Sequence, residues 1–344
     1  MTQNLAKTVE IMSQAGKGIL AADESTSTIG KRLASIGVES TEDNRRRYRE
    51  LLFTTPGIGA YLHGAILYEE TLYQSTAGGR RFTELLLEQG ILPGIKVDLG
   101  LVNLPLSQQE QITQGLDGLP ERMATYREAG AYFAKWRAVY HITDSKPSEQ
   151  AIWSNAEMLA RYAAICQEAN IVPMVEPEVL INGDHSIERC YEVTDQVLKA
   201  VFAALARHNV ALEHIILKPS MVIAGQACAE QASVDQVAEM TLRVLEANVP
   251  TRVPTINFLS GGQSDEQATE NLQAMNAIKT PAQSWELSYS YGRALQAACL
   301  QAWQGQDENH TAAQQALYKR LKLNSAAAMG QYNPDMEAEA IEMA

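Results

Sequence analysis

The feature that most constrains the fold is an alternation of short apolar runs with amphipathic segments along nearly the whole 344-residue chain. Segments such as 155–170 and 233–248 repeat an apolar residue every three or four positions, as amphipathic helices do. Strands that alternate with helices predict a parallel sheet with crossover helices. The apolar runs with the length of buried strands are 17–23, 64–70, 91–98, 132–142, 170–180, 214–223, 253–262 and 284–292.

Polar residues end several of these runs at nearly constant spacing. They are Lys96, Lys135, Glu176, Lys218 and Ser260, and no sequence repeat accompanies the period. The spacing therefore indicates successive strand–helix units rather than a solenoid. Eight such units favour an α/β fold, a closed (β/α)8 or TIM barrel with its site at the carboxyl ends of the strands. An open, doubly wound sheet is the alternative.

The domain organisation follows from the absence of a linker. No segment rich in Gly, Pro or Ser divides the chain, so residues 1–332 are expected to form one barrel domain with a short N-terminal helix. Residues 105–126 are expected to form a long loop with a short helix. Residues 333–344, which are acidic and rich in Ala and Glu, are predicted to form a tail.

Composition restricts the compartment and the partners. The chain lacks the apolar stretch of a signal peptide or a membrane span, and its four cysteines are scattered without a CxxC pair. A soluble, cytoplasmic protein with reduced thiols is expected. The net charge of -13 argues against nucleic acid or an anionic membrane as a partner, so an anionic substrate would need a local basic pocket.

Charged residues at the strand ends share faces. Lys135 and Arg137 lie on one side of their strand, as do Glu176 and Glu178 on the next, because strand side chains alternate. Lys96 has the same relation to Asp98. One interpretation is a structural ion network at the barrel mouth. The other is a catalytic cluster, which several such strands ending together favour.

The stretch IILKPS, residues 215–220, places Lys218 at the end of a buried strand. Burial and a second cation such as Lys135 disfavour the ammonium form, and the neutral amine is the form that attacks a carbonyl. Lys218 is therefore a candidate Schiff-base nucleophile. Glu176 or Glu178 is the candidate acid/base, with Asp23 as a further carboxylate.

Two glycine-bearing turns predict phosphate binding. Residues 259–266 carry Gly261 and Gly262 between a strand and a helix, and SYGRALQ adds Arg293 after the last strand. Barrels of this type often hold phosphate after these two strands. Lys31 and Arg32 on the first loop form a second basic group, which would suit a bisphosphate. Arg45 belongs to an Arg triplet that also reads as a solvated helix face.

Metal chemistry finds little support in the sequence. The six histidines show neither HxxxH nor HxH spacing, and no nucleotide-binding glycine motif is present. No metal and no cofactor are therefore expected.

The ordered motifs resemble those of class I fructose-bisphosphate aldolases. The matching stretches are KGILAADEST, GIKVDLG, TQGLDGLPER, FAKWRAV, VEPEVL, ILKPSM, LSGGQ and SYGRALQ, spread from residue 17 to about residue 332. The resemblance implies a TIM barrel, a homotetramer, and cleavage of fructose 1,6-bisphosphate to dihydroxyacetone phosphate and glyceraldehyde 3-phosphate. A lysine Schiff base would replace a metal in this reaction.

The resemblance also implies roles for individual residues. Lys218 would form the imine, Glu176 would act as general acid/base, and Lys135 and Asp23 would assist carbinolamine formation and C3–C4 cleavage. The pocket-lining and phosphate-holding residues of the family fall here on Lys96, Glu178, Arg137, Ser260, Gly261, Gly292 and Arg293. Arg32 would lie at the other phosphate, with Lys31, Ser25 and Arg45 as weaker candidates.

Three departures from the family pattern stand out. ESTGSIAKR reads ESTSTIGKR here, with Ser27 and Thr28 in place of Gly and Ser, and LKPNM reads LKPSM, with Ser220 in place of Asn. Animal members end in a tyrosine credited with proton transfer to the enamine, whereas this sequence ends at Ala344 and Tyr332 matches an earlier tyrosine.

Two other functions are compatible with parts of the pattern. Another Schiff-base sugar-phosphate enzyme, such as a transaldolase, would need the lysine but not the second phosphate holder. A non-catalytic barrel scaffold would need neither, and it would have no reason to retain all the charged strand ends.

Overall fold

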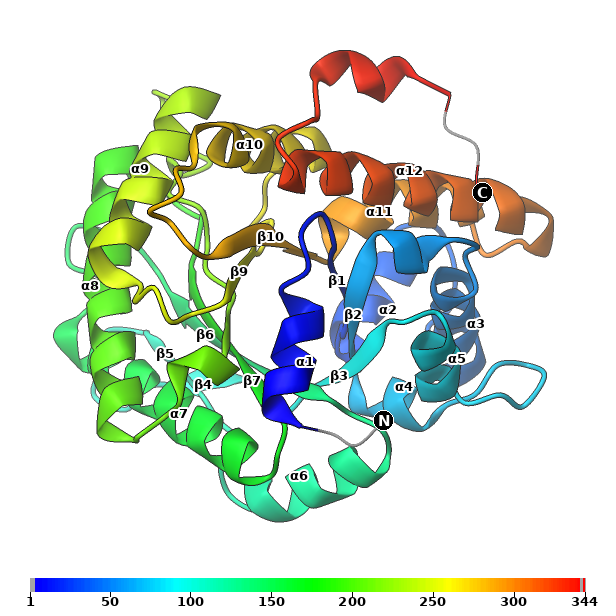
Figure 1. Cartoon of the computed structure of the whole chain (residues 1–344), viewed down its shortest axis with the longest axis horizontal. Helices are drawn as coiled ribbons and strands as arrows, with labels where there is room; N and C mark the ends of the chain where they lie inside the picture. Colours follow the sequence, from blue (N-terminus) through cyan, green and yellow to red (C-terminus); the bar gives the residue numbers. More distant parts are fainter. Residues whose placement is uncertain (1–3, 341–342, 344) are drawn as a thin grey trace.

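A computed structural model describes residues 4–340 and 343. Within this part, eight parallel strands close into a barrel in the order β1-β10-β9-β8-β7-β6-β3-β2 (Figure 1). Because β1 pairs with both β2 and β10, the sheet has no free edge there, and the closed TIM barrel is confirmed over the open sheet. The barrel strands are β1 (Gly18–Ala22), β2 (Leu62–Leu67), β3 (Leu92–Lys96), β6 (Phe133–Tyr140), β7 (Val172–Val179), β8 (Ile216–Leu217), β9 (Thr255–Phe258) and β10 (Glu286–Tyr291).

Helices form the outer layer around the barrel (Figure 1). They bury apolar stripes against the strands, and two of them begin with a capping box, at Ser233 and Ser264. The outer helices are α2 (Thr26–Ala34), α3 (Glu42–Phe53), α4 (Glu69–Tyr73), α5 (Phe82–Glu88), α6 (Leu119–Glu128), α7 (Glu149–Glu168), α8 (Ile187–Arg207), α9 (Val234–Asn248), α10 (Asp265–Ile278), α11 (Arg293–Trp303) and α12 (His310–Ala328). Short 3-10 turns are η1 (Ile58–Ala60), η2 (Leu212–His214), η3 (Asp307–Asn309) and η4 (Pro334–Ala338).

The N-terminal helix α1 (Leu5–Met12) closes one end of the barrel, as Figure 1 shows at its centre. Val9 and Met12 pack with residues at the strand starts, among them Ile19, Phe133 and Val172. The amino-terminal mouth is therefore filled by side chains, which leaves the carboxyl ends of the strands for a ligand.

Strand residues that point outward bind the helical layer to the barrel. Trp136 of β6 stacks on Tyr162 of α7 with ring centroids 5.5 Å apart, and the Tyr162 hydroxyl donates to the carbonyls of Ala134 and Met174 at 2.6 Å and 3.2 Å. Trp136 takes the face opposite to Lys135, as the sequence predicted. Such contacts fix the rotation of each strand and so decide which side chains enter the site.

Two segments differ from their predicted structure. Within the predicted loop at 105–126, β5 (Gln111–Thr113) pairs antiparallel with β4 (Leu101–Asn103), a hairpin that three-residue strands do not signal by alternation. In the predicted tail, η4 is tied to α12 through two hydrogen bonds from Arg320 to Glu337, at 2.6 Å and 2.8 Å. The tail residues 341, 342 and 344 lie outside the described part.

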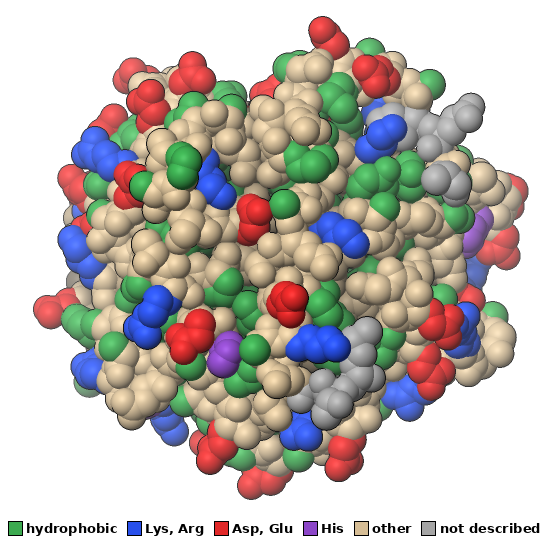
Figure 2. Space-filling view, in the orientation of Figure 1, with side chains coloured by type: hydrophobic (Ala, Val, Ile, Leu, Met, Phe, Trp, Pro, Cys, Tyr) green, Lys and Arg blue, Asp and Glu red, His purple; other side chains and the backbone are tan. Residues whose placement is uncertain are grey.

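The charges are mixed on the face that carries α1. Figure 2 shows acidic and basic side chains interspersed on the face that carries α1. No helix in the described part of the chain is both long and apolar enough to cross a membrane.

Candidate active site

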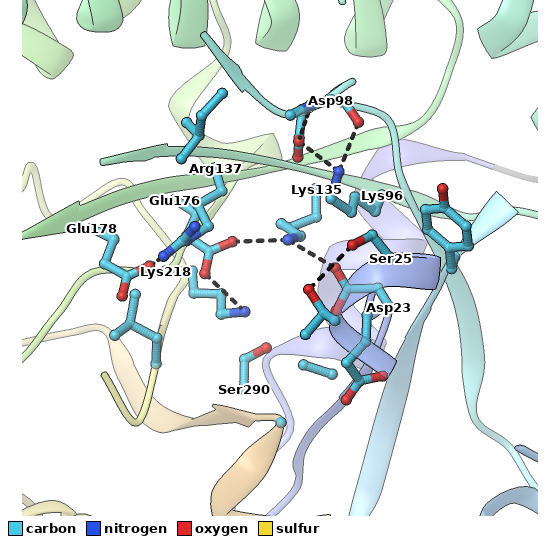
Figure 3. A pocket seen from close by; sticks show the side chains of 18 of the residues that line it. Asp23, Ser25, Lys96, Asp98, Lys135, Arg137, Glu176, Glu178, Lys218 and Ser290 are labelled. Carbon is cyan, nitrogen blue, oxygen red and sulfur yellow. Dashed lines mark hydrogen bonds and ion pairs between the residues drawn. The ribbon is translucent and has the colours of Figure 1, made fainter. Parts of the chain in front are cut away.

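A cavity of about 870 Å³ opens at the carboxyl ends of the barrel strands (Figure 3). Its lining comes from loops and strand ends that are far apart in the sequence, which is the usual construction of a TIM-barrel site. The predicted site residues that line it are Asp23, Ser25, Arg32, Lys96, Lys135, Arg137, Glu176, Glu178, Lys218, Ser260, Gly261, Gly292 and Arg293.

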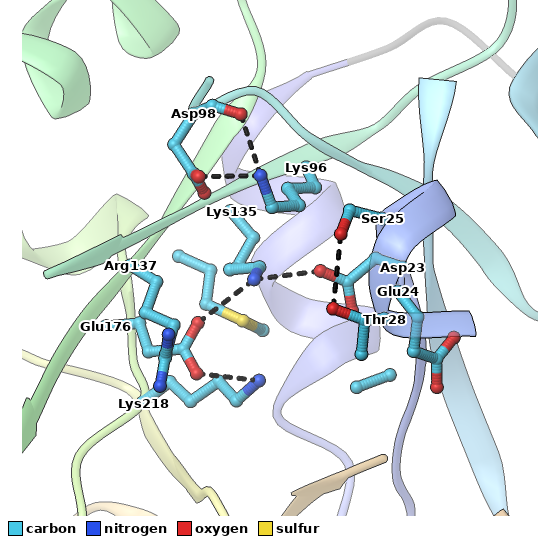
Figure 4. A network of polar contacts seen from close by, with 12 residues as sticks. Asp23, Glu24, Ser25, Thr28, Lys96, Asp98, Lys135, Arg137, Glu176 and Lys218 are labelled. Carbon is cyan, nitrogen blue, oxygen red and sulfur yellow. Dashed lines mark hydrogen bonds and ion pairs between the residues drawn. The ribbon is translucent and has the colours of Figure 1, made fainter. Parts of the chain in front are cut away.

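Four charged groups form a chain across the cavity floor (Figure 4). Lys218 Nζ lies 3.1 Å from Glu176 Oε1, and Lys135 Nζ lies 3.4 Å from Glu176 Oε2. Lys135 Nζ also lies 2.8 Å from Asp23 Oδ2. Lys135 comes from β6 and Glu176 from β7, while Asp23 and Lys218 directly follow β1 and β8, so the parallel strands bring the four groups to one mouth.

Burial and pairing set the protonation of these groups. Burial alone would raise the pKa of Asp23, but the neighbouring ammonium groups of Lys135 and Lys218 lower it to about 2. The pKa of Glu176 is lowered in the same way, against burial, by the same two lysines. Burial lowers the pKa of Lys135, yet Asp23 and Glu176 outweigh it, so the net shift is upward. Both carboxylates are therefore ionised at neutral pH, and Lys135 is charged.

Two further ion pairs flank this chain. Lys96 Nζ contacts Asp98 Oδ1 at 2.6 Å, and Arg137 pairs with Glu178. Burial lowers the pKa of Arg137, but the Glu178 carboxylate outweighs it and raises the pKa overall. The charges are thus paired, as in a structural ion network, yet they line a cavity with room for a small ligand. Glu178 is bonded to Arg137, while Glu176 lies beside Lys218, so the geometry separates the two acid/base candidates in favour of Glu176.

The two glycine-bearing turns lie at the same mouth. Gly261 and Gly262 adopt φ values of 53° and 89°, a left-handed backbone that turns the chain between β9 and α10. Gly292 precedes Arg293, the first residue of α11, and the Arg293 guanidinium donates to the carbonyl of Gln263. Arg293 therefore links the two turns, and backbone N–H groups at a helix start favour an anion.

Arg32, which the sequence predicted at a second phosphate, lies beside this anion site. A Cβ atom added to Gly292 would lie 3.8 Å from Arg32 Nη2, so the guanidinium faces the turn after β10. Which phosphate Arg32 contacts stays a prediction. On the first loop, Ser25 Oγ lies 3.1 Å from both Ser27 Oγ and Thr28 Oγ1. Thr28 thus keeps a hydroxyl at the cavity where the family pattern has Ser, and Ser27 adds one where it has Gly.

Lys31 and Arg45 are not brought to the cavity. Lys31 is exposed on α2, since the inward face of that short helix is taken by Ile29 and Leu33. Arg45 makes a two-pronged pair with Glu70, at 2.6 Å and 2.9 Å. That pair occupies the guanidinium fork, and the Arg45 side chain is only 13% exposed, so Arg45 also differs from the solvated helix face that the Arg triplet suggested.

Several lining residues were not predicted as site residues. They are Glu24, Tyr68, Glu69, Asp98, Arg122, Tyr126 and Ser290. Strand alternation placed Asp98 on the face of Lys96 in the sequence, and the same rule could have found Ser290, which shares a face with Gly292. The others come from helices and loops whose rotation no local pattern encodes.

Two remaining predictions concern metals and Tyr332. Among the described residues, no three or more His, Cys, Asp or Glu side chains are grouped as metal ligands. Tyr332 does not line the cavity, and its hydroxyl donates to Glu337 Oε1 at 3.2 Å. Ser220, at the LKPSM departure, donates to the carbonyl of Val179 at 2.9 Å.

The fold and this arrangement define a class of enzyme. A closed (β/α)8 barrel with a lysine buried beside an ionised carboxylate, and with anion-binding turns at the same mouth, is typical of enzymes that form a Schiff base with a phosphorylated carbonyl compound.

Comparison with known proteins narrows the class. The family model described as glycolytic, fructose-bisphosphate aldolase class-I, matches residues 4–344. The cytosolic fructose-bisphosphate aldolase 4 of Arabidopsis thaliana is 52% identical over 340 residues, covering 97% of this chain and 86% of that protein. A probable fructose-bisphosphate aldolase class 1 of Xanthomonas campestris pv. campestris is 52% identical, covering 96% of this chain and 98% of that protein.

A solved structure agrees with the sequence comparisons. The fructose-bisphosphate aldolase from Plasmodium falciparum, crystallised in complex with TRAP and a small-molecule inhibitor, superposes with a TM-score of 0.94 at 50% identity. The alignment covers 96% of this chain and 95% of that one. The chain belongs to the class I fructose-bisphosphate aldolase family, whose members are lyases.

Proposed function

We propose that this protein cleaves fructose 1,6-bisphosphate reversibly through a Schiff base on Lys218, with the residue roles given below. The observation that carries this proposal is the 3.1 Å contact between Lys218 Nζ and Glu176 Oε1 inside the cavity. A buried amine beside an ionised carboxylate has a proton acceptor within reach, as a carbonyl-attacking lysine needs.

Imine formation uses Lys218 and Glu176. Glu176 accepts a proton from the Lys218 ammonium, and the neutral amine then adds to the C2 carbonyl to form a carbinolamine. Glu176 returns the proton to the C2 hydroxyl, which leaves as water and yields a protonated imine. Lys135, 3.4 Å from Glu176, stabilises the carboxylate at each stage where it is ionised.

Bond cleavage uses the imine as an electron sink. Asp23, held ionised by Lys135, accepts the proton of the C4 hydroxyl. The C3–C4 electron pair moves into the imine, so glyceraldehyde 3-phosphate leaves and an enamine stays on Lys218. Protonation at C3 and hydrolysis of the resulting imine release dihydroxyacetone phosphate.

The phosphate groups orient the substrate. Ser260, Gly261, Gly292 and Arg293 hold the phosphate at C1, supported by the two turns that Arg293 links. Lys96 and Ser25 lie elsewhere on the cavity wall and are candidates for the phosphate at C6 (Figure 3). The two anchors would place C2 at Lys218 and C3–C4 near Asp23.

A coupled cleavage assay tests the function. Lys218→Met is expected to lower kcat by about 10⁴-fold or more, because the residual site can bind but cannot form the imine. EDTA is expected to leave the rate unchanged. Cleavage by Lys218→Met at the original rate would contradict the mechanism, and cleavage of a monophosphate in preference to the bisphosphate would favour another Schiff-base enzyme.

Cytoplasmic localisation and assembly into a homotetramer complete the proposal. Relatives from Arabidopsis thaliana and Spinacia oleracea are named cytosolic or cytoplasmic, whereas one from Oryza sativa is named chloroplastic. Cell fractionation tests the first expectation, and sedimentation equilibrium tests the second.

A further inference from the structure

Glu24 is a buried carboxylate that the proposed reaction does not use. It follows Asp23 after β1, and the two carboxylates diverge: Asp23 points toward Lys135 and Glu24 points away from it (Figure 4). The Glu24 side chain is only 5% exposed. A carboxylate at this depth needs cations and hydrogen-bond donors to compensate for its lost hydration.

Two cations and one amide donor from three helices meet at this carboxylate. Arg32 of α2 pairs with Oε1, Arg49 of α3 lies 2.6 Å from Oε2, and Gln296 of α11 donates to Oε1 at 3.0 Å. Gln296 is held in turn, because its Oε1 accepts from the Tyr48 hydroxyl at 3.1 Å. The partners that hold Glu24 in place therefore come from the outer helices and not from the barrel strands.

The two arginines differ in what they can reach. The Arg49 side chain is 3% exposed and does not line the cavity, whereas Arg32 is 25% exposed and does. Arg32 Nη1 is bonded to Glu24, while Nη2 lies 3.8 Å from the position of a Cβ atom on Gly292. One edge of the Arg32 guanidinium thus binds Glu24, and the other edge faces the turn after β10.

The net charge of Glu24, Arg32 and Arg49 together favours the binding of an anion. Arg32 and Glu24 alone would be a neutral pair with little attraction for phosphate. Arg49 adds a second positive charge behind Glu24, so the three side chains together keep one net positive charge. Glu24 can then orient Arg32 without cancelling its attraction for an anion.

We propose that Glu24 is a positioning residue, which holds Arg32 with its free edge toward a phosphate bound at the turn carrying Gly292 and Arg293. Arg49 keeps Glu24 in place and restores the positive charge. The assignment of that phosphate to a substrate rests on the proposed function. The binding of a phosphate group as such does not.

Inorganic phosphate and Glu24→Gln provide the test in the full-length protein. Calorimetric titration is expected to show phosphate binding about tenfold weaker in the variant, because a charge-assisted bond that orients Arg32 is lost. KM for fructose 1,6-bisphosphate is expected to rise by a similar factor, with kcat changed less than about threefold. Glu70→Gln, which frees Arg45 outside the cavity, is the matched control and is expected to change neither value.

A double-mutant cycle on phosphate binding distinguishes a positioning role of Glu24 from a merely structural one. Arg32→Met is expected to weaken phosphate binding, and the double variant Glu24→Gln/Arg32→Met is expected to be no weaker than Arg32→Met alone. Glu24→Gln/Arg49→Met removes the buried unpaired charge and keeps the test valid if Glu24→Gln folds poorly. It too should bind phosphate about tenfold more weakly.

The outcomes distinguish this proposal from the proposed function. Unchanged phosphate affinity in both Glu24 variants, or losses that multiply in the Arg32 double variant, would overturn the positioning role even if cleavage is normal. A protein that binds phosphate with the expected dependence on Glu24 but cleaves no bisphosphate would retain the positioning role and lose the proposed reaction.

Discussion

Lys135 Nζ lies 2.8 Å from Asp23 Oδ2, at a point where both side chains are almost completely buried. The same ammonium group lies 3.4 Å from Glu176. One cation therefore supports the ionised state of two carboxylates that burial alone would protonate more easily. The acid limb of the pH profile of kcat/KM is therefore expected to depend on Lys135.

Lys135→Met is expected to raise the pKa values of Asp23 and Glu176, because burial remains and the main opposing cation is lost. The acid limb of kcat/KM should shift to higher pH, and kcat should fall by about 10²-fold or more. A pH–rate profile measures both. Lys199→Met, which removes an exposed lysine paired with Asp195, should leave the profile unchanged. An acid limb that stays in place in Lys135→Met would show that Lys135 does not control these carboxylates.

His63 on β2 is expected to make stability depend on pH. Burial, with a smaller contribution from Lys17, lowers its pKa from 6.5 to about 3. Between these values the unfolded chain binds a proton that the folded chain does not, so the free energy of unfolding falls as the pH decreases from 6.5 toward 3. The contribution of His63 to the slope is up to about 1.4 kcal/mol per pH unit.

His63→Gln removes this titration, and urea unfolding at pH 4, 5 and 6 measures it. The variant should lose less stability than the original protein between pH 6 and pH 4. His310→Gln, at the half-buried start of α12, serves as the control and should retain the original slope. Equal slopes in His63→Gln and the original protein would contradict the expectation.

Gly18 on β1 is expected to tolerate no side chain. An added Cβ atom would lie 2.4 Å from Tyr289 Cε2, and the ring cannot swing away freely because its hydroxyl donates to the Tyr61 carbonyl at 2.8 Å. Gly18→Ala should therefore destabilise the fold by about 1–3 kcal/mol. In Gly78→Ala the nearest atom is 3.7 Å away, so this control should stay within about 0.5 kcal/mol of the original. Equal melting temperatures for the two variants would refute the packing argument.

The C-terminal segment is expected to depend on Glu337. Arg320 is buried and donates two hydrogen bonds to this carboxylate, at 2.6 Å and 2.8 Å. Glu337→Gln should weaken this attachment by about 1–3 kcal/mol, so limited proteolysis should cut residues 333–340 about tenfold faster. Glu339→Gln is the control, since Lys319 donates to the backbone carbonyl of Glu339, which this substitution leaves in place. Cleavage at the same rate in both variants would show that the Arg320 pair does not hold the segment.

The strand ends explain why much of the site could be predicted from the sequence. Lys96 ends β3 and Lys218 follows β8, whereas Lys135 and Glu176 lie inside β6 and β7 rather than at their ends. All four line the cavity, because the parallel strands of a barrel bring one face of each strand to the same mouth. Alternation also assigned Arg137 and Glu178 correctly to the cavity face. Strand geometry is therefore specific enough to place a side chain without tertiary information.

Residues on the first loop and its helices were harder to predict for a physical reason. A short basic stretch such as Lys31-Arg32 can place either side chain inward, and the outcome depends on how Ile29 and Leu33 dock. The Arg45 guanidinium binds Glu70 and does not reach the cavity, and no local pattern indicates this partner 25 residues away. The β4–β5 hairpin was missed because three-residue strands carry too few alternations.

Borohydride trapping tests the central claim most directly. The intact protein is incubated with fructose 1,6-bisphosphate, reduced with sodium borohydride and mapped by peptide mass spectrometry. Reduction of the imine to a secondary amine should leave a stable adduct on the peptide that contains Lys218, and Lys218→Met should give none. An adduct on Lys135 in place of Lys218, or continued cleavage with no adduct on any lysine, would contradict the account.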